Sequence, residues 1–159
     1  RTFAHIRYIE GLCLYDCQQY GDALRKFTEA SDARTTLGDL RGAAYTLLWQ
    51  SRILLMTANL ETSVERYRRS AEIARKVGDL ALMAFTGEIG GEIALAQEDQ
   101  LRAGKMLSLS RLIRENITFP VPSVDRSRTM ELYASADIAT LENHEQDAAV
   151  LADNLCGLL

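Results

Sequence analysis

Proline is scarce in this 159-residue chain, where Pro120 and Pro122 are the only two. Because proline interrupts helices and the interiors of sheets, its absence before residue 120 permits long uninterrupted elements. No run of residues alternates apolar and polar side chains long enough to predict a strand. No apolar stretch approaches the ~18 residues that a membrane-spanning helix requires. The sequence therefore predicts an all-α protein without a membrane segment.

Cysteine and histidine, which build disulfide frameworks and metal sites, are also few. The three cysteines are an odd number, which favours a reduced, cytoplasmic protein. Cys13 and Cys17 lie one helical turn apart, and we expect both to be small buried apolar residues. A metal site there would find only His5 on the same helix, and His144 is distant in sequence. We therefore predict no catalytic site, no metal and no cofactor.

Neither sign of charge dominates, since 18 basic and 22 acidic residues give a formal net charge of −4. This balance argues against a nucleic-acid footprint spread across the chain. The most basic segment, 60–77, contains Arg66 and Arg69, but Glu65 and Glu72 stand at helical spacing among its cations. We expect a solvated outer face there, with Glu65 paired to Arg69. A patch that binds an anion or nucleic acid is the alternative.

A repeat of 40 residues organises the sequence. The tetrapeptide Leu-Gly-Asp-Leu at 37–40 recurs as Val-Gly-Asp-Leu at 77–80. Small residues recur with the same step, and so do pairs of a small residue and a large apolar one four positions later. These positions are Gly11, Ser51 and Gly91, and the pairs Ala23/Phe27, Ser63/Tyr67 and Ala103/Leu107. A fixed period of this length is the signature of a stacked helical-repeat array.

Helical periodicity and short turns predict about eight helices in antiparallel hairpins. The expected helices cover about 2–18, 21–37, 40–57, 60–77, 80–97, 99–116, 125–142 and 145–158, with both prolines in a loop over 117–124. Glycines are expected just after three helix ends, at Gly21, Gly38 and Gly78. Side chains that accept hydrogen bonds are expected to cap three helix starts, at Asp39, Asp79 and, more weakly, Asn59.

These residues resemble the tetratricopeptide-repeat (TPR) family. In that family a small residue, an aromatic four later and a small residue three after that mark the second helix of each repeat, as at Ala23, Phe27 and Ala30. The resemblance implies a right-handed stack of antiparallel helical hairpins, an α-solenoid, as a single domain over 1–159. Its repeats would cover about 2–37, 40–77, 80–116 and 125–158. The resemblance is strong over 11–110 and weak after Asn116.

The chain departs from the common TPR pattern in length and in two residue types. Its unit is 40 residues rather than 34, and it lacks the usual tryptophan of the first helix and the closing proline. Long-helix variants of this kind resemble those of MalT-like bacterial regulators, kinesin light chains and polarity adaptors. The missing initial methionine and the apolar end at 155–159 lead us to expect a fragment of a longer protein.

In an array of this family, the first helix of each pair lines the concave surface. When the residues of these first helices are placed by helical projection, one side of them predicts a partner-binding groove. Its residues are Tyr8, Tyr45, Trp49, Arg52, Phe85, Glu88, Glu92 and Tyr133. Aromatic residues and arginine are the side chains that most often anchor a protein partner. The alternative is that the aromatics only pack between first helices, and for Trp49 alone we favour this core position.

We therefore predict a cytoplasmic protein–protein interaction scaffold that binds a peptide or helix of a partner on its concave face and is not an enzyme. The alternative is a sensor or oligomerisation segment of a bacterial transcriptional regulator or signalling ATPase. A small-molecule-binding or enzymatic helical domain is a third reading. The expected partners are proteins or peptides, with neither direct nucleic-acid nor membrane binding. A homo-oligomer through the terminal helices is a further expectation.

Overall fold

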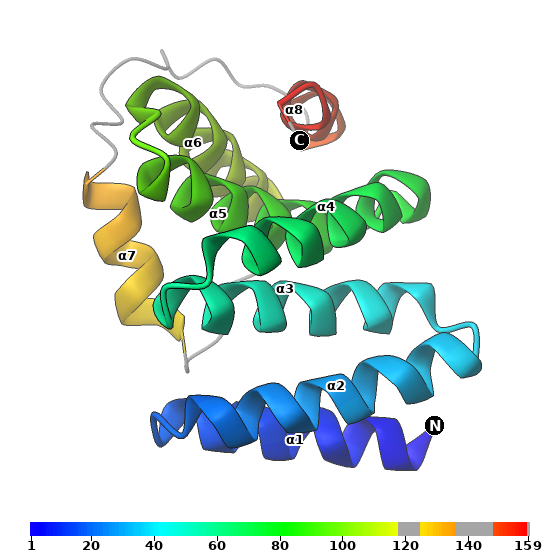
Figure 1. Ribbon diagram of the computed structural model, residues 1–159. Coiled ribbons are helices and arrows are strands. Elements are labelled where there is room, and N and C mark those ends of the chain that lie inside the picture. The colour runs from blue at the N-terminus through cyan, green and yellow to red at the C-terminus, as the bar shows by residue number, and fades with distance from the viewer. Residues whose placement is uncertain (118–124, 136–147, 159) are drawn as a thin grey trace. The chain divides into compact units, whose positions relative to one another are not determined.

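The computed structural model describes residues 1–117, 125–135 and 148–158, and every regular element within these ranges is a helix (Figure 1). The helices are α1 (Thr2–Asp16), α2 (Tyr20–Thr36), α3 (Leu40–Met56), α4 (Leu60–Val77), α5 (Leu80–Ala96), α6 (Gln100–Ile117), α7 (Arg126–Ser135) and α8 (Ala148–Cys156). The predicted all-α class is thus confirmed. None of the described helices combines the length and apolar character needed to cross a membrane.

The helices fall into two compact units, residues 1–77 (unit 1) and residues 78–159 (unit 2). In unit 1, α1 packs on α2, α2 on α3, and α3 on α4. In unit 2, α5 packs on α6, α8 lies against α6 and α5, and α7 contacts α6 (Figure 1). The first three predicted hairpins are therefore present. The fourth, over 125–158, and the loop with both prolines fall partly outside the described residues.

The turns repeat with the same step as the helices. Between hairpins, Gly38 and Gly78 have left-handed φ angles of 69° and 66°, a conformation that side chains disfavour. Within hairpins the left-handed residues are not glycines but Gln18, Ala58 and Glu98. The predicted roles of Gly38 and Gly78 are confirmed. The prediction for Gly21 was wrong, because Gly21 is the second residue of α2 and Gln18 makes the preceding turn.

Four helix starts are capped at regular 20-residue steps. At each of them a side-chain oxygen accepts a hydrogen bond from the backbone N–H three residues later. The N–O distances are 2.9 Å at Asp39, 3.4 Å at Asn59, 2.7 Å at Asp79 and 3.0 Å at Asp99. The long distance at Asn59 agrees with its expected weakness as a cap. Asp99, which we expected inside the helix, is instead the residue that caps α6.

Glycine stands where the two helices of a hairpin cross most closely. A Cβ atom on Gly11 of α1 would lie 2.8 Å from Cε1 of Phe27 on α2. A Cβ atom on Gly91 of α5 would lie 2.6 Å from Cγ of Leu107 on α6. Both distances are too short for a side chain, and both Phe27 and Leu107 are fully buried. The predicted close approach at these small residues is therefore confirmed.

In the α3–α4 hairpin, Ser51 takes the position that Gly11 and Gly91 have in the other two hairpins. Hydrogen bonds join the two helices there. Ser51 Oγ donates to the carbonyl oxygen of Ser63 at 2.9 Å, and Ser63 Oγ donates to that of Ser51 at 2.8 Å. Both serines are completely buried. Because each hydroxyl is satisfied by the facing backbone, these polar groups are accommodated in the interior.

The crossing contact predicts different outcomes for two glycine substitutions. Alanine gains helix propensity at either position, but only at Gly11 does its methyl group press on the buried ring of Phe27. At Gly21 nothing lies within 4 Å of the added Cβ. We expect Gly11→Ala to be less stable than Gly21→Ala by about 1–3 kcal/mol in urea denaturation, the usual cost of overpacking. Equal stabilities would contradict the tight crossing.

Candidate functional site

Four of the predicted groove residues lie in unit 1, where two of them, Tyr8 and Arg52, contact a third, Trp49. Trp49 Nε1 donates a hydrogen bond to Tyr8 Oη at 3.1 Å. The Trp49 ring stacks on Phe27 with centroids 6.0 Å apart, and the Arg52 guanidinium lies 5.7 Å from the Trp49 ring centroid. Trp49 is only 2% exposed, which confirms the core position favoured for it. Tyr45, the fourth residue, is half-buried beside Arg41.

The other four predicted residues lie in unit 2, where the structure joins two of them directly. Tyr133 of α7 donates its hydroxyl hydrogen to Glu88 Oε1 of α5 at 2.6 Å. Glu92 follows Glu88 one turn later on α5 and is bonded to the same short helix: Arg128 Nε of α7 donates to Glu92 Oε2 at 3.0 Å. The acidic pair on α5 therefore holds α7 through two side chains. Phe85 is buried on α5.

Arg114 of α6 completes the arrangement around Glu88. Its Nη2 donates to Glu88 Oε2 at 2.9 Å, and its Nε donates to Glu88 Oε1. Glu88 is completely buried and Arg114 is 7% exposed, so this fork-shaped pair lies in the interior. Leu107 and Tyr133 pack together beside it. One carboxylate thus ties α5 to α6 and to α7.

Burial changes the ionisation of the two groups that contact Glu88. Burial, followed by the negative charge of Glu88, raises the pKa of Tyr133 well above its ordinary value of 10.0. Burial alone would lower the pKa of Arg114, but the hydrogen bond and charge of Glu88 outweigh it, and the pKa is raised. Tyr133 therefore remains a neutral donor and Arg114 a full cation over the physiological pH range.

Six of the eight predicted groove residues are at most 6% exposed: Trp49, Arg52, Phe85, Glu88, Glu92 and Tyr133. Only Tyr8 and Tyr45 are half-buried. In this structure the six side chains are packed inside the protein and do not form an open groove. Their binding of a partner stays a prediction.

Sequence reasoning missed Arg114 and Arg128, the cations that neutralise the acidic pair. Arg114 did carry a signal. It continues the buried stripe of α6 that runs through Ala103, Met106, Leu107, Ser110 and Ile113, so helical projection places it on the inner face. No comparable pattern marks Arg128, whose contact with Glu92 spans 36 residues of sequence.

Helix α1 carries an exposed apolar surface that sequence reasoning did not single out. Phe3 is 53% exposed, Ile6 50% and Ile9 43%. At 100° per residue, Cys13 falls on the same side of the helix, and it is exposed as well. These four residues are called the outer face of α1. The buried residues of this helix, Ala4, Gly11 and Tyr15, lie on the opposite side.

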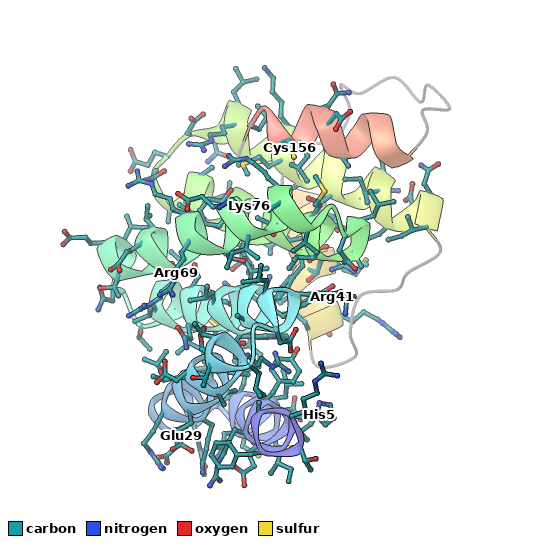
Figure 2. The ribbon with its side chains drawn as sticks, turned by 90° about the vertical axis from the view of Figure 1, so that its right-hand side faces the viewer. His5, Glu29, Arg41, Arg69, Lys76 and Cys156 are labelled. Atoms are coloured by element: carbon teal, nitrogen blue, oxygen red, sulfur yellow. The ribbon has the colours of Figure 1, made fainter. Side chains whose placement is uncertain are left out.

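The exposure of Cys13 and Cys17 contradicts their predicted burial. Cys13 lies on the outer face of α1, and Cys17 follows the last residue of that helix as its C-cap. His5 of α1 is exposed as well (Figure 2). Among the described residues, no three His, Cys, Asp or Glu side chains gather into a group that could hold a metal ion.

Comparison of the chain with protein-family models, with curated proteins and with solved structures finds no match. The resemblance to TPR repeats therefore rests on the residues themselves and stays a prediction.

The buried pair around Glu88 predicts a large effect of a small substitution. Glu88→Gln leaves the buried Arg114 guanidinium without its counter-charge, so the free energy of unfolding should fall by roughly 3–5 kcal/mol. Glu115→Gln is the control, since it removes one partner of the exposed Arg111–Glu115 pair on α6. It should cost about 0.5 kcal/mol or less. Urea denaturation followed by circular dichroism measures both losses, and equal losses would contradict the role of the buried pair.

The raised pKa of Tyr133 predicts a dependence of stability on alkaline pH. Unfolded tyrosine loses its proton near pH 10, whereas folded Tyr133 keeps it, so its contribution is complete below that pH and declines above it. We expect wild type to be more stable than Tyr133→Phe at pH 8. The difference should shrink by about 1.4 kcal/mol per pH unit above pH 10. A difference in unfolding free energy that stays constant from pH 8 to pH 12 would exclude this linkage.

Proposed function

We propose that this chain is a protein–protein interaction scaffold that binds a helix of a partner protein. The observation that carries the proposal is the outer face of α1, where three large apolar side chains are exposed on one side of the helix. A contiguous apolar patch on a protein surface usually marks an interaction site. Covering a Phe or Ile side chain completely gains about 1.5–3 kcal/mol, so three such residues can anchor a helix.

The 40-residue repeat indicates what covers such a face. One repeat later, α3 carries the four corresponding positions, which are Ala43, Thr46, Trp49 and Ile53, and all of them are at most 3% exposed. Helix α2 packs on α3. Its Phe27 stacks on Trp49, and its Arg34 Nη1 donates to Thr46 Oγ1 at 3.3 Å. The face that α3 buries beneath α2 is therefore the face that α1 exposes.

This correspondence defines the chemistry of the partner helix. In α2 the large Phe27 stands between the small residues Ala23 and Ala30, which lets the helix approach closely. We expect a partner helix with the same small–large–small pattern. The outer face of α1 is more apolar than its counterpart, because Phe3 and Ile6 replace an alanine and a threonine. The partner should accordingly be less polar than α2 along this contact.

A peptide with the sequence of residues 19–37 of this chain, which contains all of α2, tests the proposal. We expect the fluorescently labelled peptide to bind the full chain. Ile6→Glu should weaken binding at least about tenfold, because the contact would then bury an unpaired charge. Leu101→Glu is the matched control, since Leu101 is 71% exposed on α6. Fluorescence anisotropy measures binding, and circular dichroism checks that both variants keep their helices.

Two results would overturn the proposal. One is equal peptide binding by wild type and Ile6→Glu, and the other is no binding by wild type at millimolar peptide. Light scattering on the same samples tests the alternative of an oligomerisation segment. A dimer that Ile6→Glu dissociates would show that a second copy of the chain, rather than a partner helix, covers the outer face of α1.

A further inference from the structure

A polar groove of about 340 Å³ opens on unit 1 where α2, α3 and α4 meet. Its lining includes Thr28, Asp32 and Thr35 from α2, Gln50 from α3, and Arg66 and Arg69 from α4. Leu47 is its one apolar lining residue. A volume of this size lies near the lower end for ligand sites, roughly 300–1,000 Å³. The groove therefore differs in chemistry from the outer face of α1.

The two arginines of the groove have no carboxylate partner within the described part of the chain. Neither Arg66 nor Arg69 forms an ion pair there, and the expected Glu65–Arg69 pair is not formed. Arg66 is half-buried, and Arg69 is exposed at the surface of α4 (Figure 2). Two arginines on one helix wall, neither in an ion pair among the described residues, can bind an anionic ligand.

One repeat earlier, the same two positions are neutralised. Arg66 and Arg69 correspond to Lys26 and Glu29 on α2. Lys26 Nζ lies 3.2 Å from Glu10 Oε2 and 3.9 Å from Glu29 Oε2. On α4 the acid is replaced by a second cation, so this wall of the groove carries two arginines and no ion pair among the described residues. The helical repeat itself does not require this replacement, because α2 packs without it.

The opposite wall of the groove presents acceptors. Thr28 Oγ1 donates its own hydrogen to the Leu24 carbonyl at 2.9 Å, and Thr35 Oγ1 donates to the Ser31 carbonyl at 2.8 Å. Thr35 Oγ1 therefore keeps its lone pairs for the groove, and Thr28 Oγ1 keeps one besides the long hydrogen bond that it accepts from Gln50. The carboxylate of Asp32 is a further acceptor. A ligand that fits both walls must carry an anionic group that pairs with the arginines of α4 and N–H groups that donate to the acceptors of α2.

The floor supplies a further donor. Gln50 is 3% exposed, and its Nε2 reaches Thr28 Oγ1 only at the long distance of 3.5 Å. Such a weak hydrogen bond is easily exchanged for one to a ligand oxygen. We propose that this groove binds an acidic peptide segment, with a side-chain carboxylate on Arg66 and Arg69 and backbone N–H groups on the acceptors of α2. Inorganic phosphate lacks the N–H groups that would bond to the acceptors of α2.

Titration of the full chain with the peptide acetyl-Ala-Glu-Glu-Ala-amide tests the proposal, with isothermal calorimetry for affinity and the Gln50 side-chain amide signal in NMR for location. We expect binding, a shift of that signal, and affinity that falls as salt rises. The double variant Arg66→Gln/Arg69→Gln should bind at least about tenfold more weakly, since charged hydrogen bonds are lost. Arg68→Gln is the matched control on the same helix and should stay within about twofold.

The control ligands give the outcomes that would overturn the proposal. The neutral peptide acetyl-Ala-Gln-Gln-Ala-amide should bind at least about tenfold more weakly, and equal binding would exclude recognition of the carboxylate. Phosphate or glutarate binding as tightly as the acidic peptide would exclude the role of backbone N–H groups. If Arg68→Gln weakened peptide binding as much as the double variant does, the binding would depend on the overall positive charge of α4 and not on the two arginines of the groove. The site would also be refuted if the acidic peptide did not bind at a concentration of about 10 mM, which would detect even a dissociation constant in the millimolar range.

Discussion

Each of the first three hairpins of this protein depends on one close crossing between its two helices. At that point a small residue of the first helix meets the second helix, as Gly11 meets Phe27 and Gly91 meets Leu107. A crossing of this kind fixes both the separation of the helices and their rotation about their own axes. Because it recurs every 40 residues, it assigns the same face of each first helix to the same neighbour. The outer face of α1 and the covered face of α3 are comparable only for this reason.

The first six helices could be predicted from sequence to within two residues at each end. Their signals are local: apolar periodicity, glycine at 38 and 78, and acidic caps such as Asp39. The turns within hairpins were not predictable in the same way, because Gln18, Ala58 and Glu98 take left-handed conformations without being glycine. The intrinsic preference of these residue types disfavours that conformation, so the residues themselves give no signal for it.

The candidate site was less predictable than the fold, because faces follow from periodicity but partners do not. Glu88 and Glu92 were correctly placed on one face of α5, yet their cations lie 26 and 36 residues further along the chain. The period of a helix says which side chains point inward, but not which of them come within hydrogen-bond distance. The contacts of these two acids with Arg114, Arg128 and Tyr133 therefore could not be predicted from the period of the helix.

Departures from the repeat are informative because its geometry is constant. At the positions of the buried Leu48 and Arg52 of α3, α5 has Glu88 and Glu92. Packing between hairpins does not require acids there, since α3 is buried without them, and their consequence is the polar attachment of α7. The same reasoning applies to Arg69 of α4, which replaces the paired Glu29 of α2.

Such a replacement changes the charge of a surface while leaving the crossing intact. Side chains on the outside of a hairpin can thus differ without altering its core, because each hairpin needs only its own crossing and the contact with its neighbours. In this chain the apolar outer face of α1 and the two groove arginines of α4 both result from differences between residues at equivalent positions of the 40-residue repeat. The helices that carry them keep the same packing.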